Sequence, residues 1–252
     1  MSETNGNGNG KSPMGCTHGT DAPPTVITDL AASCVQYVQR SIGFTLDFTP
    51  ETLPVLDHYV ELARTAATER KETTSLIAQA IGAYLGEVTR RQYGGYWRVE
   101  DDPRSFRVEL EPVYLVLRPI ELVTRSLELP VEPRATDIIS SRSRDNDDDD
   151  DDGDDADDSA REGDEESSNE NDLRIEQDLQ DDVRLALFEV DDDDRESIAE
   201  RLAALPPVPA TQYHSPSTHF EVVELIVETI RARRIAAGMG PDAHLEPDDY
   251  AS

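Results

Sequence analysis

The segment from Thr73 to Trp97 constrains the fold of this 252-residue chain more than any other part of the sequence. Apolar residues recur in it at steps of three and four, which predicts an amphipathic helix with one buried stripe about 100° wide. Gly94 and Gly95 then end the helix, because glycine adopts positive φ without steric cost. We therefore expect a helix, a sharp stop and a β-strand in direct succession. The predicted stripe consists of Leu76, Ile77, Ala80, Ile81, Tyr84, Leu85 and Val88.

Two further glycines, Gly82 and Gly86, lie four residues apart inside this predicted helix. Each costs up to about 1 kcal/mol relative to alanine, so a compensating contact is expected. The favoured interpretation is a close crossing by a neighbouring helix or strand. The alternative is a groove lined by backbone that takes a ligand.

Other amphipathic helices are predicted on both sides of this segment. The apolar spacing indicates helices over residues 29–41, 50–67, 197–205 and 218–237, and a short one that opens at Pro119. The last long helix is introduced by the capping-box pattern Thr218-x-x-Glu221. Between residues 96 and 117 the period changes to two, which predicts an antiparallel meander of about three strands with one face in water. The expected fold class is α+β, with amphipathic helices packed on a small antiparallel sheet.

Negative charge dominates the composition, with 54 acidic against 23 basic residues and a formal net charge of −31. Residues 142–172 alone hold 17 acids against three arginines, and the rest of the chain keeps a charge of −17. Repulsion between like charges predicts that this stretch is a disordered loop that interrupts the fold. An acidic surface repels phosphate groups, so we expect no binding to nucleic acid or to membranes, and a basic protein as partner.

These patterns divide the chain into five parts. We expect a disordered head over residues 1–24, an α+β domain over 25–140 and the disordered Asp/Glu-rich loop over 141–172. Residues 173–237 are expected to complete the same domain with helical structure, and residues 238–252 to form a disordered tail. Within them, residues 173–190 do not decide between strand and helix.

The compartment follows from three features. No apolar run is long enough to span a membrane, and the first residues lack the pattern of a secretory signal. Cys16 lies in the predicted head and Cys34 on an apolar helical face, so a disulfide between them is not expected. We therefore expect a cytoplasmic protein in which Cys34 is a small buried apolar residue.

Sequence motifs for cofactors, metals and catalysis are missing. The chain contains no GxxxxGK[ST], GxGxxG, HExxH or GxSxG pattern. We therefore assign no cofactor, no metal and no catalytic residue. His214 and His219 flank a loop with two serines, and we interpret His219 as a polar residue of a first helical turn. His58 lies off the apolar stripe of its helix and is expected in solvent.

One cluster at the end of the central helix is the candidate site. It comprises Glu87, Arg90, Arg91, Tyr93, Tyr96 and Trp97. Glu87 and Arg91 are four residues apart, which supports a helix by a few tenths of a kcal/mol. Two arginines beside three aromatic residues can form a pocket for an anion or a peptide carboxylate. The alternative is a helix end where a salt bridge and aromatic rings cover the core.

The central helix and its turn resemble a pattern from another group of proteins. The run from Ala80 to Val88, AIGAYLGEV, is followed by Arg90-Arg91-x-Tyr93-Gly94-Gly95-x-Trp97. This is similar to uncharacterised bacterial domains of unknown function, in which such a helix meets a Gly-Gly-x-Trp turn and short strands. The resemblance covers about residues 50–120 and implies a small α+β domain. It implies no activity and assigns no site residue.

Three functions are compatible with these patterns. The first is a non-catalytic binding or regulatory module that acts through protein contacts, with the acidic loop steering it toward a basic partner. The second is an enzyme of unfamiliar type with a pocket at the helix–sheet junction near Arg91 and Trp97. The third is an acidic mimic of nucleic acid. A junction filled by side chains would remove the pocket that the second function requires.

Overall fold

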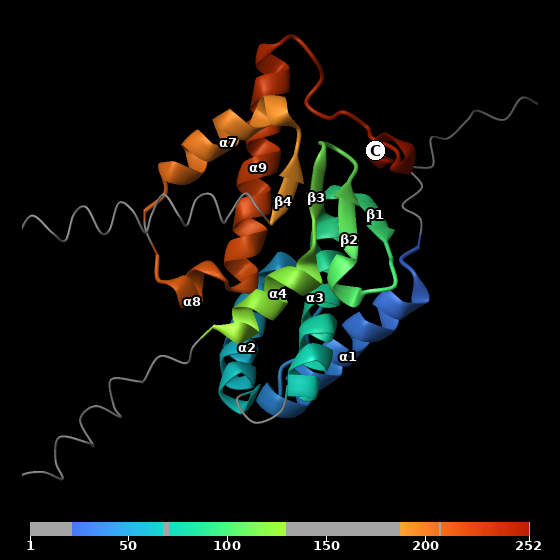
Figure 1. Ribbon diagram of the computed structural model, residues 1–252, viewed down its shortest axis with the longest axis vertical. Coiled ribbons are helices and arrows are strands. Elements are labelled where there is room, and N and C mark those ends of the chain that lie inside the picture. Colours follow the sequence, from blue (N-terminus) through green and yellow to red (C-terminus); the bar gives the residue numbers. More distant parts are fainter. Residues whose placement is uncertain (1–21, 68–70, 130–186, 207, 252) are drawn as a thin grey trace, which may run out of the picture.

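The computed structural model describes residues 22–67, 71–129, 187–206 and 208–251. Its helices are α1 (Thr25–Ile42), α2 (Leu53–Ala67), α3 (Lys71–Tyr93), α4 (Pro119–Glu128), α7 (Asp192–Ala203), α8 (Ala210–Tyr213) and α9 (Pro216–Ala236) (Figure 1). Its strands are β1 (Gly95–Arg98), β2 (Arg107–Leu110), β3 (Leu115–Leu117) and β4 (Phe188–Val190). Short 3-10 helices cover Pro50–Thr52, Pro103–Ser105 and Pro247–Tyr250. The predicted α+β class is confirmed.

Several expectations concern residues outside these ranges. The head up to residue 21, the acidic loop 141–172 and residues 173–186 all lie there. Among the helices that the structure describes, none is long and apolar enough to cross a lipid bilayer.

The four strands form one antiparallel sheet in the order β1-β2-β3-β4. The first three strands are the predicted meander. The fourth comes from the ambiguous segment 173–190 and pairs with β3 through Val116 and Glu189. Figure 1 shows β4 beside β3, with α7 following it directly. Residues 188–190 therefore belong to the same sheet as residues 95–117, although a long stretch of chain separates them.

The helix α3 passes through the middle of the molecule, and the prediction of a single buried stripe was too narrow. Every residue from Ala80 to Arg90 is buried. Ala83 packs with the sheet, α7 and α9, whereas Ile81 and Leu85 pack with α1 and α2. At the start of the helix, Leu76 is 58% exposed, although the stripe included it. Burial on all sides follows because helices cover the faces that the sheet does not.

Gly82 and Gly86 are the positions where α3 is crossed most closely. A Cβ atom on Gly82 would lie 2.5 Å from the Cα atom of Ile120, at the start of α4. A Cβ atom on Gly86 would lie 2.4 Å from a ring carbon of Trp97 in β1. Real Cβ atoms do not approach other atoms this closely. The prediction of a close crossing is confirmed, and these glycines do not line a ligand groove.

The residues after α9 differ from the expectation of a disordered tail. Residues 238–251, here called the C-terminal strap, run back over the turn between β2 and β3. Ala243 and Leu245 donate their backbone N–H groups to the carbonyls of Pro112 and Glu111, at 2.7 and 2.8 Å. Tyr250 is buried, with its hydroxyl against the same turn. The polar composition of these residues does not predict such contacts, because the contacts join a few groups to residues that are distant in the sequence.

The start of α9 also differs from the prediction. The helix begins at Pro216, and the hydroxyl of Ser215 accepts the N–H of Thr218 at 3.3 Å. Thr218 therefore lies inside the helix and is not its cap. Asp57 of α2 accepts the backbone N–H of Ser217 at 3.0 Å, so a carboxylate from another helix binds an N–H group that would otherwise lack a partner.

Candidate functional site

The Glu87 carboxylate is the centre of the candidate site, and it is only 2% exposed. Its Oε1 atom accepts the Nε–H of Arg90 and the indole N–H of Trp97, both at 2.8 Å. Its Oε2 atom accepts a second N–H of Arg90 at 3.2 Å and the Nε–H of Arg91 at 3.4 Å. The helix supplies the two arginines at the third and fourth positions after Glu87, and β1 supplies Trp97 after the glycine turn. Both carboxylate oxygens are therefore occupied by donors from the protein itself.

These contacts keep Glu87 ionised. Burial acts to raise the pKa of its carboxyl, but hydrogen bonds from Arg90 and Trp97 and the charges of Arg90 and Arg91 outweigh burial and lower the pKa. A proton-transfer group at neutral pH needs the opposite shift. The geometry and the electrostatics both fit a structural ion pair that joins α3 to β1.

Arg91 lies at the rim of this cluster, with its side chain 48% exposed. Its guanidinium sits 4.0 Å from the ring centroid of Phe48, a cation–π contact with the loop between α1 and α2. The Phe48 backbone has a φ of 64°, and its N–H donates to the hydroxyl of Tyr84 at 2.8 Å. Phe48 is a part of this cluster that sequence reasoning missed, because its contact depends on a positive φ in a loop.

The other two aromatic residues of the candidate site point elsewhere. Tyr93 packs against Phe220 of α9, with ring centroids 6.1 Å apart. Burial and the charge of Glu224 raise the pKa of Tyr93 to about 12. Tyr96 precedes Trp97 in β1, so its side chain lies on the opposite face of the sheet. The structure therefore brings together Glu87, Arg90, Arg91 and Trp97, but separates Tyr93 and Tyr96 from them.

Beside β1 lies a surface hollow of ≈ 340 Å³. Its lining consists of Ala22, Pro23, Pro24, Tyr96, Trp97, Arg98 and Pro247. Glu87 and Arg91 do not line it. The one charged group in the lining, Arg98, donates its Nε–H to Glu109 at 2.9 Å and a second N–H to the carbonyl of Pro247. The helix–sheet junction itself is filled by Trp97 and Ile120, which contact the two glycines of α3.

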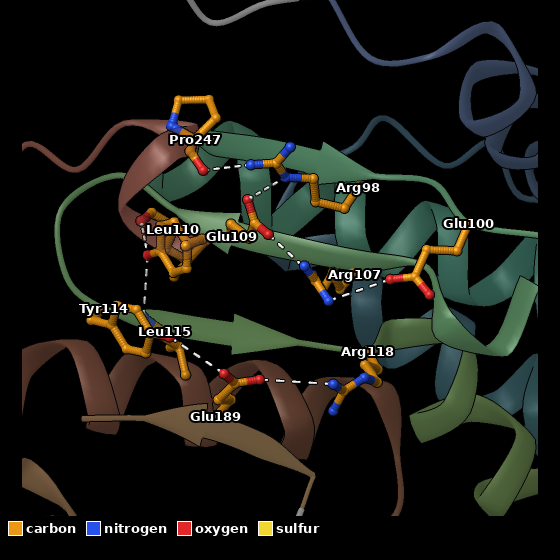
Figure 2. A network of polar contacts seen from close by, with 11 residues as sticks. Arg98, Glu100, Arg107, Glu109, Leu110, Tyr114, Leu115, Arg118, Glu189 and Pro247 are labelled. Atoms are coloured by element: carbon orange, nitrogen blue, oxygen red, sulfur yellow. Dashed lines mark hydrogen bonds and ion pairs between the residues drawn. The ribbon is translucent and has the colours of Figure 1, made fainter. Parts of the chain in front are cut away.

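A second buried carboxylate lies on the outer face of the sheet, the face that was expected to lie in water (Figure 2). Glu109 of β2 is 0% exposed. Its oxygens accept Nε–H groups from Arg98 at 2.9 Å and from Arg107 at 3.0 Å. Arg98 and Arg107 are directly opposite each other in the β1–β2 register, where like charges repel. The Glu109 carboxylate offsets that repulsion. The sequence alone does not show that Arg98 faces Arg107, because this depends on the register of the two strands.

The C-terminal strap closes this network at one end. Figure 2 shows Arg98 directed at the carbonyl of Pro247, and a second set of contacts around Glu189. Glu189 of β4 accepts the hydroxyl of Tyr114 at 3.3 Å and lies 3.7 Å from Arg118. The outer face of the sheet thus carries two sets of polar contacts. One joins β1, β2 and the strap, and the other joins β4 to Tyr114 and Arg118 on either side of β3.

Cys34, His58 and His219 differ in their exposure and in their contacts. Cys34 is fully buried, and burial raises the pKa of its thiol well above the usual range, as expected for a small apolar residue. His58 is 55% exposed, as predicted. His219 does lie in the first turn of α9, but it is buried and its Nε2 atom has no hydrogen-bond partner, which corrects its interpretation as a simple polar residue. Among the described residues, no three His, Cys, Asp or Glu side chains gather closely enough to hold a metal ion.

Comparisons with family models, with curated proteins and with solved structures gave no match to this chain. This result is consistent with the resemblance of residues 50–120 to uncharacterised domains of unknown function.

Proposed function

We propose that this chain is a non-catalytic binding module that recognises a basic protein through its acidic surface. The observation that carries the proposal is that most of the described arginines are paired with carboxylates. In the described ranges, ten arginines form ion pairs with carboxylates of the same chain: Arg90, Arg91, Arg98, Arg104, Arg107, Arg118, Arg125, Arg195, Arg231 and Arg233. Most of the positive charge within those ranges is thereby neutralised at short range, and the excess of acidic groups sets the long-range field.

The exposed acids lie on neighbouring elements. Glu221, Glu224 and Glu228 are exposed along α9. Asp192, Glu196 and Glu200 are exposed along α7, which packs beside α9. Such a surface attracts a basic partner and accelerates its association, and it disfavours phosphate backbones and anionic membranes. The acidic residues 142–172 would add to the same field.

Two further observations support a binding role over the enzyme alternative. The candidate site near Arg91 and Trp97 is filled at the junction, and its one buried carboxylate is held ionised by three donors. The hollow beside Trp97 has only one charged side chain, which is already engaged. A pocket at this junction with convergent polar groups, which the alternative requires, has no support from this geometry.

We also propose a cytoplasmic location. Its support is the buried Cys34, which forms no disulfide and has an unreactive thiol. A reducing compartment suits such a residue.

The test is a pull-down from a lysate of the source organism at low and at physiological salt, followed by affinity measurements with the purified partner. Three baits are compared: the intact chain, a deletion of residues 145–166, and a matched control in which the acids of 145–166 become amides at unchanged length. The proposal expects a basic partner whose affinity falls with salt and falls equally in the last two baits. Failure of every bait to retain a partner at either salt would contradict it. A DNA-handling partner lost on deletion would instead favour mimicry of nucleic acid.

A further inference from the structure

A hollow of ≈ 370 Å³ lies where the start of α7, the end of α9, the β2–β3 turn and the C-terminal strap meet. We call it the α7–α9 hollow. Its apolar lining comes from Val113, Ile230, Ala237, Met239, Ala243 and Leu245. Three exposed aspartates, Asp191, Asp193 and Asp249, line it from two different elements. An apolar cavity lined in part by carboxylates suits a ligand that is both apolar and cationic.

The two arginines at the hollow are already engaged. Arg233 donates N–H groups to the carbonyl of Asp193 and to the carboxylate of Asp194. Arg234 donates to the carbonyls of Gly240 and Asp242, at 3.0 and 3.2 Å. These contacts hold the strap against the end of α9.

Carboxylates outnumber guanidinium groups at the hollow, because Asp191, Asp193, Asp194 and Asp249 line it against Arg233 and Arg234. Asp191 accepts the backbone N–H of Asp193 at 3.1 Å. Asp249 accepts the backbone N–H of Glu246 at 2.8 Å. A backbone N–H carries no net charge, so both carboxylates still contribute a negative field to the hollow.

Titration shifts of the groups around the hollow agree with this field. Burial raises the pKa of Tyr114, and the charges of Glu189 and Asp191 raise it further. Burial also raises the pKa of Asp194; Arg233 opposes this, while Asp191 and Asp193 add to it. In both cases the negative charge of the neighbouring acids favours the protonated, neutral form of the side chain.

One wall of the hollow is aromatic. Tyr114 lines it and stacks on Tyr250, with ring centroids 4.8 Å apart and planes inclined by 15°. Tyr250 is fixed in turn by the hydrogen bond from its hydroxyl to the carbonyl of Val113 at 3.0 Å. A planar guanidinium stacks on such a ring better than an ammonium does and is more weakly hydrated.

We propose that the α7–α9 hollow receives an arginine side chain of the basic partner. The methylene groups lie on the apolar floor, and the guanidinium meets Asp191, Asp193 and Asp249 beside Tyr114. The volume is at the small end of ligand pockets, which span about 300–1,000 Å³, so it suits one side chain. This inference rests on the proposed function and places one contact of the partner on the surface.

The experiment measures fluorescence anisotropy of a labelled peptide of four Arg-Gly-Ser repeats on the full chain at physiological salt. The same peptide with lysine or glutamine in place of arginine supplies the ligand controls. The test variant carries Asp191→Asn, Asp193→Asn and Asp249→Asn. Asparagine keeps an oxygen for the backbone contacts and still caps a helix. The control variant carries Glu200→Gln, Glu221→Gln and Glu224→Gln, which changes net charge equally at exposed positions of α7 and α9 that lie more than one helical turn from the lining of the hollow.

We expect the test variant to lose about tenfold in affinity and the control variant about threefold or less, because charges beyond a Debye length of about 8 Å are largely screened. The arginine peptide should bind more tightly than the lysine peptide, and the glutamine peptide should not bind. Equal losses in the two variants, or equal affinity for arginine and lysine, would overturn the inference and leave the proposed function standing. A wild-type chain that binds none of the peptides would contradict both. Thermal unfolding of each variant checks that the fold is kept.

Discussion

Replacing Gly82 by alanine sets two physical effects against each other. Alanine in the middle of a helix is favoured over glycine by about 1 kcal/mol, so helix propensity alone predicts a more stable protein. In the structure, however, the new Cβ atom would lie 2.5 Å from the Cα and 2.7 Å from the N atom of Ile120. These are backbone atoms of α4, which cannot move without shifting the helix. Overpacking in a dense core costs about 1–3 kcal/mol, and contact with backbone places this site at the upper end.

The expected net result for Gly82→Ala is a loss of about 2 kcal/mol in the free energy of unfolding. For a chain of this size, that lowers Tm by roughly 4–8 °C. Thermal and urea unfolding measure it, with Gly240→Ala as control, because a Cβ there meets nothing closer than 3.9 Å. The control should change stability by less than about 0.5 kcal/mol. A Gly82→Ala protein as stable as the wild type, or more stable, would refute the close crossing of α3 and α4.

Three further outcomes are expected. Arg90→Ala leaves Glu87 buried without its main partner and should lower the free energy of unfolding, measured in urea, by about 3 kcal/mol. Arg91 is half-exposed, so Arg91→Ala should lower it by about 1 kcal/mol or less. If Arg91 lined a ligand pocket, Arg91→Ala would instead abolish binding with little change in stability. The pKa of His219 is lowered from 6.5 to about 3, by burial first and then by a neighbouring histidine. The unfolded chain thus binds a proton that the folded chain excludes, so stability is lost as pH falls from about 6.5 toward 3. Between pH 7 and 5 the wild type should lose about 2 kcal/mol more than His219→Phe in urea titrations, and parallel pH profiles would contradict this. Tyr250→Phe should cost about 1–3 kcal/mol and speed amide exchange in the β2–β3 turn; unchanged exchange would show that the strap is not anchored there.

The candidate site shows how far sequence reasoning reached. Glu87, Arg90 and Arg91 are one helical turn apart, so their meeting follows from helical geometry alone. Trp97 joins them because the glycine turn is short and leaves β1 few directions. Tyr93 and Tyr96 were grouped with them by proximity in the sequence, and they separate because a helix end and an alternating strand point neighbouring side chains to different faces.

Local information determined the long helices, the stop at Gly94 and Gly95 and the α+β class of this chain, because the spacing of apolar residues and the conformation of glycine depend on residues close in sequence. The short helix α8 is not predicted by that spacing, and α7 begins at Asp192 and not at residue 197. The tertiary structure alone decided three other features. It buried Glu109 between two arginines, which required the register of β1 against β2. It joined Asp57 to Ser217 across 160 residues, and Tyr250 to Leu110 across 140 residues. Contacts of that range depend on how whole elements pack, and neither composition nor periodicity records which distant groups will meet.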